Sequence, residues 1–152
     1  MKVSDNGIAL IQKFEGLKTK PYRDCIGLWT VGIGTLIGDG KSLPDNWNRT
    51  FTVEECHALL RKELVGIERG ITKYISVSLN QNQFDALCSF VYNLGLGTLQ
   101  RSTLRQKLNR KDIQGCLESW AKYNKAGGKV FKGLDLRRKA EIKLFGATVS
   151  NQ

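Results

Sequence analysis

The chain has 152 residues, of which 41% are hydrophobic and 25% charged, a composition typical of a soluble globular protein and not of a disordered or fibrous one. It carries 24 Lys and Arg against 14 Asp and Glu, and it has no run of about 18 apolar residues, which argues against a membrane span. A chain of this length buries enough surface to fold without disulfide bonds or structural metals, and we expect a single domain over residues 1–152.

The net charge of +10 is unevenly distributed along the chain. Residues 101–152 hold 13 Lys and Arg against 4 Asp and Glu, which leaves +9 in this part. A basic lobe attracts polyanions over about a Debye length, so nucleic acid, an anionic cell envelope and an acidic membrane surface are candidate partners. The alternative is a solvated basic face with no partner, and charge alone does not choose among these.

The first third of the chain predicts one helix followed by a small sheet. Ser4 or Asp5 caps an amphipathic helix that runs to about Glu15. Between Tyr22 and Ile33, β-forming residues alternate with glycines, a pattern that indicates a hairpin. The stretch over 39–49 contains Pro, Asp and Asn and predicts a turn or loop.

The rest of the chain predicts a helical bundle. Thr52 and Glu55 form a capping box at the start of a helix that extends towards Tyr74. The most hydrophobic helix begins at Asn80 and ends at Gly95. Shorter helices are expected over about 102–110, 112–122 and 134–145, with a Gly- and Lys-containing loop before the last. The fold class is therefore α+β, with a β-containing lobe over about 16–55 and a helical lobe made of 1–15 and 70–152.

The chain has four cysteines without the spacing of a metal site or a redox motif. Cys88 and Cys116 fall on apolar helical stripes, so buried free thiols are favoured over a disulfide framework. Cys25 is expected to be a packed or semi-exposed thiol and not a switch. His57, beside Cys56, is expected on the solvated side of its helix.

Glu15, Asp24 and Thr30 are the residues most typical of a chemical site. A helix end and a hairpin would bring two carboxyls and a hydroxyl to one cleft, which is the equipment for hydrolysing a glycosidic bond. Glu15 lies on the apolar side of its helix, which should keep it protonated, whereas Asp24 in a polar turn should be ionised. Taken singly, a structural acid, a turn-capping Asp and an ordinary strand Thr remain open alternatives.

Together these residues match a known pattern. The runs are Phe14-Glu15-Gly16, Pro21-Tyr22-x-Asp24, Gly27-x-Trp29-Thr30-Val31-Gly32-Ile33-Gly34-Thr35, Phe90-Val91-Tyr92-Asn93-Leu94-Gly95 and Arg137-Arg138-x-x-Glu141. With them the chain resembles the phage-type lysozymes (endolysins) of glycoside hydrolase family 24, closest to the soluble endolysins of lambdoid-type phages.

The resemblance implies a lysozyme-like fold with an active-site cleft between the two lobes. It implies Glu15 as the catalytic acid, Asp24 as the second carboxylate and Thr30 as the residue that holds the attacking water. The implied reaction is hydrolysis, with inversion, of the β-1,4 bond between N-acetylmuramic acid and N-acetylglucosamine in peptidoglycan.

The resemblance also implies supporting residues. Arg137 would pair with Glu15, with Arg138 as the competitor for that role. Thr35 occupies a position where some family members have histidine. Independently of the resemblance, Asn93, with Gly95 and Thr98, closes the most hydrophobic helix where the two lobes would face one another, and is a candidate to line the cleft, against plain helix termination as the alternative.

The expected partner is the glycan strand of peptidoglycan, without cofactor, metal, nucleic acid or stable membrane insertion. We expect a monomer made in the host cytoplasm without a signal peptide, which reaches the wall after a holin-type protein permeabilises the membrane. Two rival functions remain at this stage. A nucleic-acid module would interleave aromatic and basic residues on one surface, and a lytic transglycosylase would need only the Glu.

Overall fold

The computed structural model describes residues 1–148 of the chain. The chain divides into two compact units: unit 1 comprises Met1–Leu10 and the chain from Leu64 onward, and unit 2 comprises Ile11–Glu63. Helices α1 and α2 each begin in one unit and end in the other. The expected lobe boundaries, at about residues 16, 55 and 70, remain a prediction about domain organisation.

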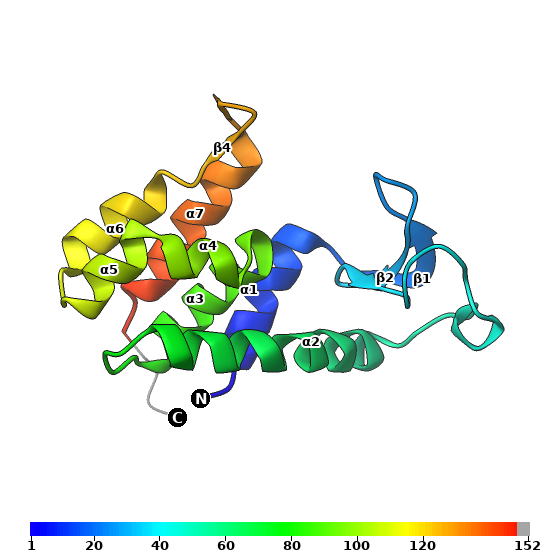
Figure 1. Cartoon of the computed structure of the whole chain (residues 1–152). Helices are drawn as coiled ribbons and strands as arrows, with labels where there is room; N and C mark the ends of the chain where they lie inside the picture. Colours follow the sequence, from blue (N-terminus) through cyan, green and yellow to red (C-terminus); the bar gives the residue numbers. More distant parts are fainter. Residues whose placement is uncertain (149–152) are drawn as a thin grey trace. The chain divides into compact units, whose positions relative to one another are not determined.

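Unit 2 contains the predicted small sheet. After α1 (Asp5–Glu15), strands β1 (Lys18–Arg23), β2 (Trp29–Gly32) and β3 (Thr35–Leu36) form an antiparallel meander in the order β1-β2-β3 (Figure 1). The β1–β2 register is irregular between Lys18 and Tyr22, where Pro21 has no N–H to donate to the ladder. The antiparallel sheet expected from the alternating pattern is confirmed.

A small hydrophobic cluster holds this sheet to the start of α2. Its buried members are Val31, Ile37, Phe51 and Cys56, and partly buried side chains including Trp29 and Trp47 pack against them. Burying apolar area contributes roughly 25 cal/mol per Å², so this cluster is what fixes the sheet in unit 2. The segment expected to be a loop over 39–49 contains one short 3₁₀ turn, η1 (Asp45–Trp47).

Helix α2 (Val53–Tyr74) begins at the predicted capping box. The Thr52 hydroxyl accepts the Glu55 N–H at 3.0 Å, and the Glu55 carboxylate accepts the Thr52 N–H at 3.0 Å. The helix continues past Gly70, where a Cβ would come within 2.3 Å of the Leu96 side chain. The glycine therefore permits a close contact between α2 and the chain around Leu96, which offsets its weak helix propensity.

Unit 1 is a helical bundle built around α3 (Gln81–Leu94), which is capped by a reciprocal Asn80–Gln83 box. The other helices are α4 (Leu96–Arg101), α5 (Thr103–Asn109), α6 (Ile113–Ala121) and α7 (Lys132–Phe145), and α3 packs chiefly against α7 (Figure 1). In the core of the bundle, Trp120 packs edge-on against Phe90 and Phe145, with ring centroids 5.5 and 5.3 Å apart.

The sequence-based expectation was incomplete in two places in unit 1. The stretch after Gly95 is a six-residue helix, α4, that was not expected. The predicted Gly- and Lys-containing loop carries a short hairpin, β4 (Lys125–Ala126) with β5 (Lys129–Val130), and α7 begins at Lys132, two residues earlier than expected.

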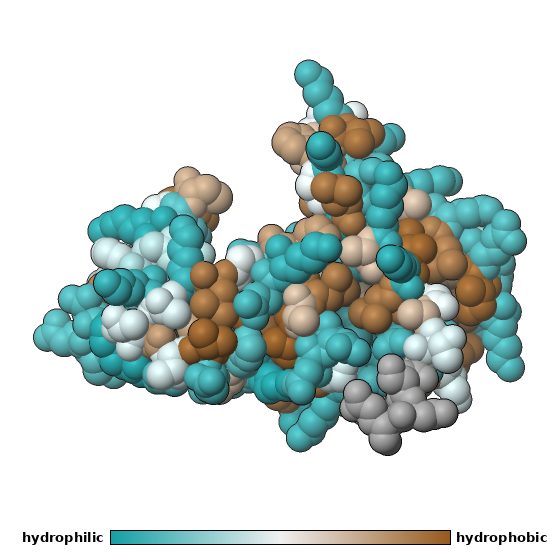
Figure 2. Space-filling model, turned by 180° about the vertical axis from the view of Figure 1, so that it is seen from behind, coloured by the Kyte–Doolittle hydropathy of each residue, from teal (hydrophilic) through white to brown (hydrophobic). Residues whose placement is uncertain are grey.

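All four cysteines are free thiols; Cys56, Cys88 and Cys116 are buried, as expected. Cys25, expected to be packed or semi-exposed, is exposed. On the face shown in Figure 2, apolar residues reach the surface in separate patches among hydrophilic ones. No helix among residues 1–148 combines the length and apolar character needed to cross a bilayer.

Candidate active site

Glu15 is the last residue of α1, in the part of the helix that belongs to unit 2, and it is half-buried. The helix ends there because Gly16 adopts a positive φ of 80°, while its N–H still donates to the Gln12 carbonyl at 2.8 Å. This left-handed step turns the chain from the helix into β1. The Glu15 carboxyl is thus presented at the junction between helix and sheet.

Asp24 lies in the β1–β2 turn and shapes it. Its Oδ1 accepts the N–H groups of Ile26 and Leu28, at 3.0 and 2.9 Å, and its own N–H donates to the Leu28 carbonyl at 2.9 Å. The turn-capping interpretation of Asp24 is therefore correct for Oδ1. No other residue of the described chain bonds Oδ2, so the second oxygen of the carboxylate is available for chemistry.

Thr30 sits in β2 and is 4% exposed. Its hydroxyl donates a hydrogen bond to the Leu28 carbonyl at 3.0 Å. A hydroxyl has one proton and two lone pairs, so Thr30 can offer only acceptor sites to a water molecule. A water that donates to Thr30 turns its own lone pairs away from it, which is the orientation that a nucleophile needs.

Tyr22 is a site residue that the sequence analysis did not single out. It lies directly opposite Thr30 across β1 and β2, so the two side chains share one face of the sheet. Burial raises the pKa of the Tyr22 phenol above its ordinary value, and the nearby carboxylates of Asp24 and Glu15 raise it further. Both acids are therefore close to the same phenol, beside Thr30.

The signal that would have found Tyr22 is its strand register. Two residues opposite each other in a hairpin can be paired from the sequence once the turn is placed, and Asp24 marks that turn. The charged end of Lys18 also lies 4.2 Å from the centre of the Tyr22 ring, which holds the ring from one side.

Thr35 is in β3, opposite Val31 on β2, and it is 6% exposed. Its hydroxyl is buried without a hydrogen-bond partner among the described residues. A buried unpaired hydroxyl costs free energy, and such a group is usually satisfied by water or ligand. Thr35 therefore offers an unused donor and acceptor within the same small sheet.

Arg137 and Arg138 belong to unit 1, where both are buried and both bind Glu141 of the same helix. Arg137 Nε donates to Glu141 Oε2 at 3.3 Å, and Arg138 Nη2 donates to it at 3.1 Å. Arg138 Nε also lies 2.8 Å from Glu141 Oε1, an ion-pair distance, but its N–H direction makes no hydrogen bond there. Ser89 and Trp120 complete the set of donors to Glu141.

Arg138 makes further contacts within unit 1. It donates to the Tyr123 carbonyl at 3.3 Å and to Asn93 Oδ1 at 2.8 Å, and it stacks on the Phe90 ring. These contacts make Arg138 a structural residue of the bundle. The pairing of Arg137 with Glu15 remains a prediction.

The three residues proposed to line a cleft take part in helix junctions of unit 1. Asn93 is half-buried and accepts from Arg138, Gly95 ends α3 and precedes α4, and the Thr98 hydroxyl donates to the Leu94 carbonyl at 2.8 Å. Their role in substrate binding also remains a prediction.

His57 differs from its expected state. It is half-buried, and its Nε2 lies 2.8 Å from Gln12 Oε1. His57 therefore links α2 to α1 near the end of α1, within unit 2. Among residues 1–148, no group of three or more His, Cys, Asp and Glu side chains is placed to hold a metal ion.

The chain is similar in sequence and in structure to known proteins. The phage lysozyme family matches residues 12–141, which include Glu15, Asp24, Thr30 and Thr35. The endolysin of Salmonella phage P22 is 37% identical over 149 residues, which cover 95% of this chain and 98% of that protein. A crystal structure of a mutant P22 lysozyme superposes with a TM-score of 0.87 at 35% identity, covering 97% of this chain and 99% of that one.

A third relative is longer than this chain. The endolysin of Bacillus phage B103 is 40% identical over 147 residues, which are 95% of this chain but only 54% of that protein. The chain therefore spans about half the length of this relative and nearly all of the P22 protein. The structural match confirms the expected lysozyme-like α+β fold.

Proposed function

We propose that this chain, which belongs to the phage lysozyme family, is a muramidase, a glycoside hydrolase that acts on bacterial peptidoglycan, and that Glu15, Asp24 and Thr30 perform the hydrolysis. Its function is that of an endolysin, which degrades the host wall and so releases phage. The bond cut is the β-1,4 linkage between N-acetylmuramic acid and N-acetylglucosamine.

The observation that supports these three residues most strongly is their relation to Tyr22. Glu15 ends α1 and Asp24 follows β1 in the turn, yet the charges of both, after burial, raise the pKa of Tyr22, and Thr30 lies opposite Tyr22 across the sheet. All four residues belong to unit 2. This shared relation to Tyr22 supports the assignment of the three residues to one site.

The proposed reaction proceeds by single displacement. Glu15 donates its proton to the glycosidic oxygen as the bond to the anomeric carbon breaks, and positive charge develops on the sugar ring. A water that donates to Thr30 attacks the anomeric carbon from the opposite face. Asp24 Oδ2 stabilises the positive charge and takes the proton that the water loses. The configuration at the anomeric carbon is inverted.

Tyr22 and Thr35 support this arrangement. A phenol whose pKa is raised stays neutral at the pH of the reaction, so Tyr22 adds no third negative charge beside the two carboxyls. Thr35 supplies an unpaired hydroxyl for the sugar or for a second water.

Further features of the proposal concern other residues and the cell. Arg137 is proposed as a supporting residue and Asn93 as a residue that contacts the glycan. The protein acts as a monomer, and a holin-type partner gives it access to the wall. The +9 charge of residues 101–152 supports attraction to an anionic envelope.

The test is product analysis on purified peptidoglycan. Hydrolysis by the proposed route gives new reducing ends on N-acetylmuramic acid, which borohydride converts to muramicitol. A 1,6-anhydro product would instead identify a transglycosylase, and cleavage of only amide bonds would reject glycosidase activity. The anomer formed first, followed by NMR on a soluble fragment, distinguishes inversion from retention.

A further inference from the structure

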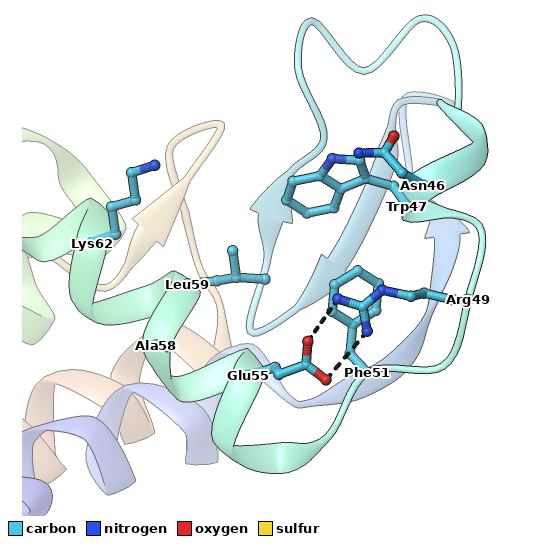
Figure 3. Close-up of a pocket in the computed structure, with 8 residues that line it drawn as sticks. All are labelled: Asn46, Trp47, Arg49, Phe51, Glu55, Ala58, Leu59 and Lys62. Carbon is cyan, nitrogen blue, oxygen red and sulfur yellow. Dashed lines mark hydrogen bonds and ion pairs between the residues drawn. The ribbon is translucent and has the colours of Figure 1, made fainter.

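Unit 2 contains a cavity that is distinct from the residues proposed for catalysis. It has a volume of about 430 Å³, and its lining residues are Asn46, Trp47, Arg49, Phe51, Glu55, Ala58, Leu59 and Lys62 (Figure 3). None of Glu15, Asp24, Thr30 and Thr35 lines it. This volume is within the range of small-molecule sites, roughly 300–1,000 Å³.

The two walls of the cavity come from different elements. Asn46 and Trp47 project from η1, and Arg49 and Phe51 follow in the chain. Opposite them, Glu55, Ala58, Leu59 and Lys62 recur at the spacing of one helical face of α2. Figure 3 shows Trp47 and Leu59 pointing towards one another across the space.

Several contacts connect the residues that line the cavity. The Arg49 guanidinium lies 3.8 Å from the centre of the Phe51 ring and binds Glu55 through two hydrogen bonds, at 3.2 and 2.6 Å. Glu55 is fixed in turn by the capping box with Thr52. Trp47 packs against Phe51 with ring centroids 5.6 Å apart. These contacts link the loop after η1 to the first turn of α2 at the cavity.

Hydrogen-bonding capacity remains at the rim. The exposed Asn46 amide, the Trp47 indole N–H and the Lys62 ammonium have no side-chain partner among residues 1–148. An indole face beside amide and ammonium donors suits a pyranose ring, which has apolar C–H faces and a rim of hydroxyl and acetamido oxygens. The unpaired ammonium of Lys62 favours a ligand that carries acceptor oxygens or carboxylates.

We propose that this cavity is a second carbohydrate-binding site, which holds an N-acetylated amino sugar of the peptidoglycan glycan strand through Trp47, Asn46 and Lys62. The inference rests on the proposed function, because it takes the same polymer as the ligand. Binding a polymer at two points makes the second contact intramolecular and retains the enzyme on the wall between cuts.

The direct test follows the Trp47 indole N–H by NMR while N-acetylglucosamine tetramer is added to the Glu15→Gln variant. The expected result is a saturable shift of the Trp47 signal, with the buried Trp120 signal as the internal reference. The Trp47 signal staying fixed while the oligomer binds elsewhere on the protein would overturn the proposal.

Matched variants test the contribution of each side chain in sedimentation with intact peptidoglycan. In the Glu15→Gln background, Trp47→Ala should weaken binding about tenfold, as expected for removal of an aromatic anchor. Because Trp47 also packs on the core, Asn46→Ala and Lys62→Ala, at exposed positions, provide the second readout and should each weaken binding by about threefold. Lys73→Ala, at an exposed position on the same helix outside the cavity, is the control and should bind as the parent does.

Activity on soluble and insoluble substrates distinguishes the second binding site from the proposed catalytic function. With Glu15 intact, Asn46→Ala and Lys62→Ala should cut short soluble oligosaccharides at the wild-type kcat but process insoluble peptidoglycan several-fold more slowly. Equal activity of these variants and the wild type on both substrates would reject the second site while the muramidase assignment stands. A wild-type protein that cuts neither substrate would instead reject the proposed catalytic function.

Discussion

At the scale of single residues, the structural task of Asp24 and its proposed chemical task involve different oxygens. Oδ1 accepts two N–H groups of the β1–β2 turn, which fixes the carboxylate, and Oδ2 is the oxygen proposed to take part in the reaction. Thr30 likewise has a structural hydrogen bond, because its hydroxyl proton is donated to the Leu28 carbonyl and only its lone pairs remain for a water. The turn-capping alternative considered from the sequence is therefore compatible with catalysis.

The water-orienting role of Thr30 predicts the effect of removing its hydroxyl. Thr30→Val keeps the shape of the side chain but leaves the attacking water without its acceptor, so kcat should fall about 100-fold with little change in KM. The lost hydrogen bond to Leu28 should cost about 1 kcal/mol of unfolding free energy. Steady-state release of reducing ends, with thermal denaturation in parallel, measures both. Wild-type kcat in a folded Thr30→Val variant would remove Thr30 from the mechanism.

Tyr22 provides a probe of whether the two carboxylates converge. Because burial and then the charges of Asp24 and Glu15 raise its pKa, Asp24→Asn and Glu15→Gln should each move the Tyr22 pKa back towards its ordinary value. Ultraviolet titration of phenolate, assigned with Tyr22→Phe, measures the change, and Asp39→Asn is the control. If only one of the two variants lowered the pKa, the other acid would be too far away for the proposed site.

At the scale of elements, the start of α2 contains a pH-dependent interaction. Hydrogen bonds from Arg49, and then from the Thr52 N–H, lower the Glu55 pKa to about 2. A folded-state pKa below the unfolded value, roughly 4.3, means that this interaction stabilises the fold fully above that pH. Its contribution is lost as the pH falls through about 2.

An NMR titration of the Glu55 carboxyl tests this interaction. In the wild type, Glu55 should titrate near 2. In Arg49→Ala it should titrate nearer its ordinary value, because the hydrogen bonds from Arg49, which lower the Glu55 pKa most, are gone. The pair is partly exposed, so high salt should reduce the difference. An ordinary midpoint in the wild type would show that the ion pair does not persist in solution.

The sequence predicted the longer elements well because their signals are periodic and capped. The Thr52–Glu55 box begins α2, Gly16 ends α1, and glycines and β-formers indicated the sheet. The short elements α4 and β4–β5 were missed because six-residue helices and two-residue strands have no periodicity to read. The close packing of Gly70 against Leu96 was not predictable, because it depends on a contact distant in sequence.

The site was predictable only in part, for the same reason. Glu15, Asp24 and Thr30 stand in a recognisable linear spacing, whereas the place of Tyr22 depends on strand register and the unpaired state of Thr35 on three-dimensional packing. His57 appeared solvated because its partner, Gln12, lies 45 residues away in the chain. The cavity beside Trp47 likewise joins a loop to a helix face, which the linear pattern does not show.

At the scale of the whole molecule, the charge distribution predicts a salt dependence. The +9 of residues 101–152 should draw the protein to an anionic wall, and salt shortens the Debye length from about 10 Å at 0.1 M to about 3 Å at 1 M. Solubilisation of intact peptidoglycan should therefore slow as salt rises, whereas cutting of a neutral soluble oligosaccharide should not.

A charge-reduced variant identifies the region responsible. Substitution of exposed lysines in the β4–β5 hairpin and at the start of α7, as Lys125→Gln, Lys129→Gln and Lys132→Gln, should flatten the salt profile on peptidoglycan. Lys2→Gln, at an exposed position elsewhere, serves as a single-charge control. A flat salt profile already in the wild type would mean that the basic region does not guide the enzyme to its substrate.

Glu15 is proposed to supply the proton that releases the sugar. The value of kcat for Glu15→Gln on purified peptidoglycan measures this role directly. The substitution keeps the size of the side chain and removes the acidic proton, so kcat should fall by about 1,000-fold or more while the unfolding temperature stays close to that of the wild type. A folded Glu15→Gln enzyme that releases reducing ends within tenfold of the wild-type rate would contradict the account.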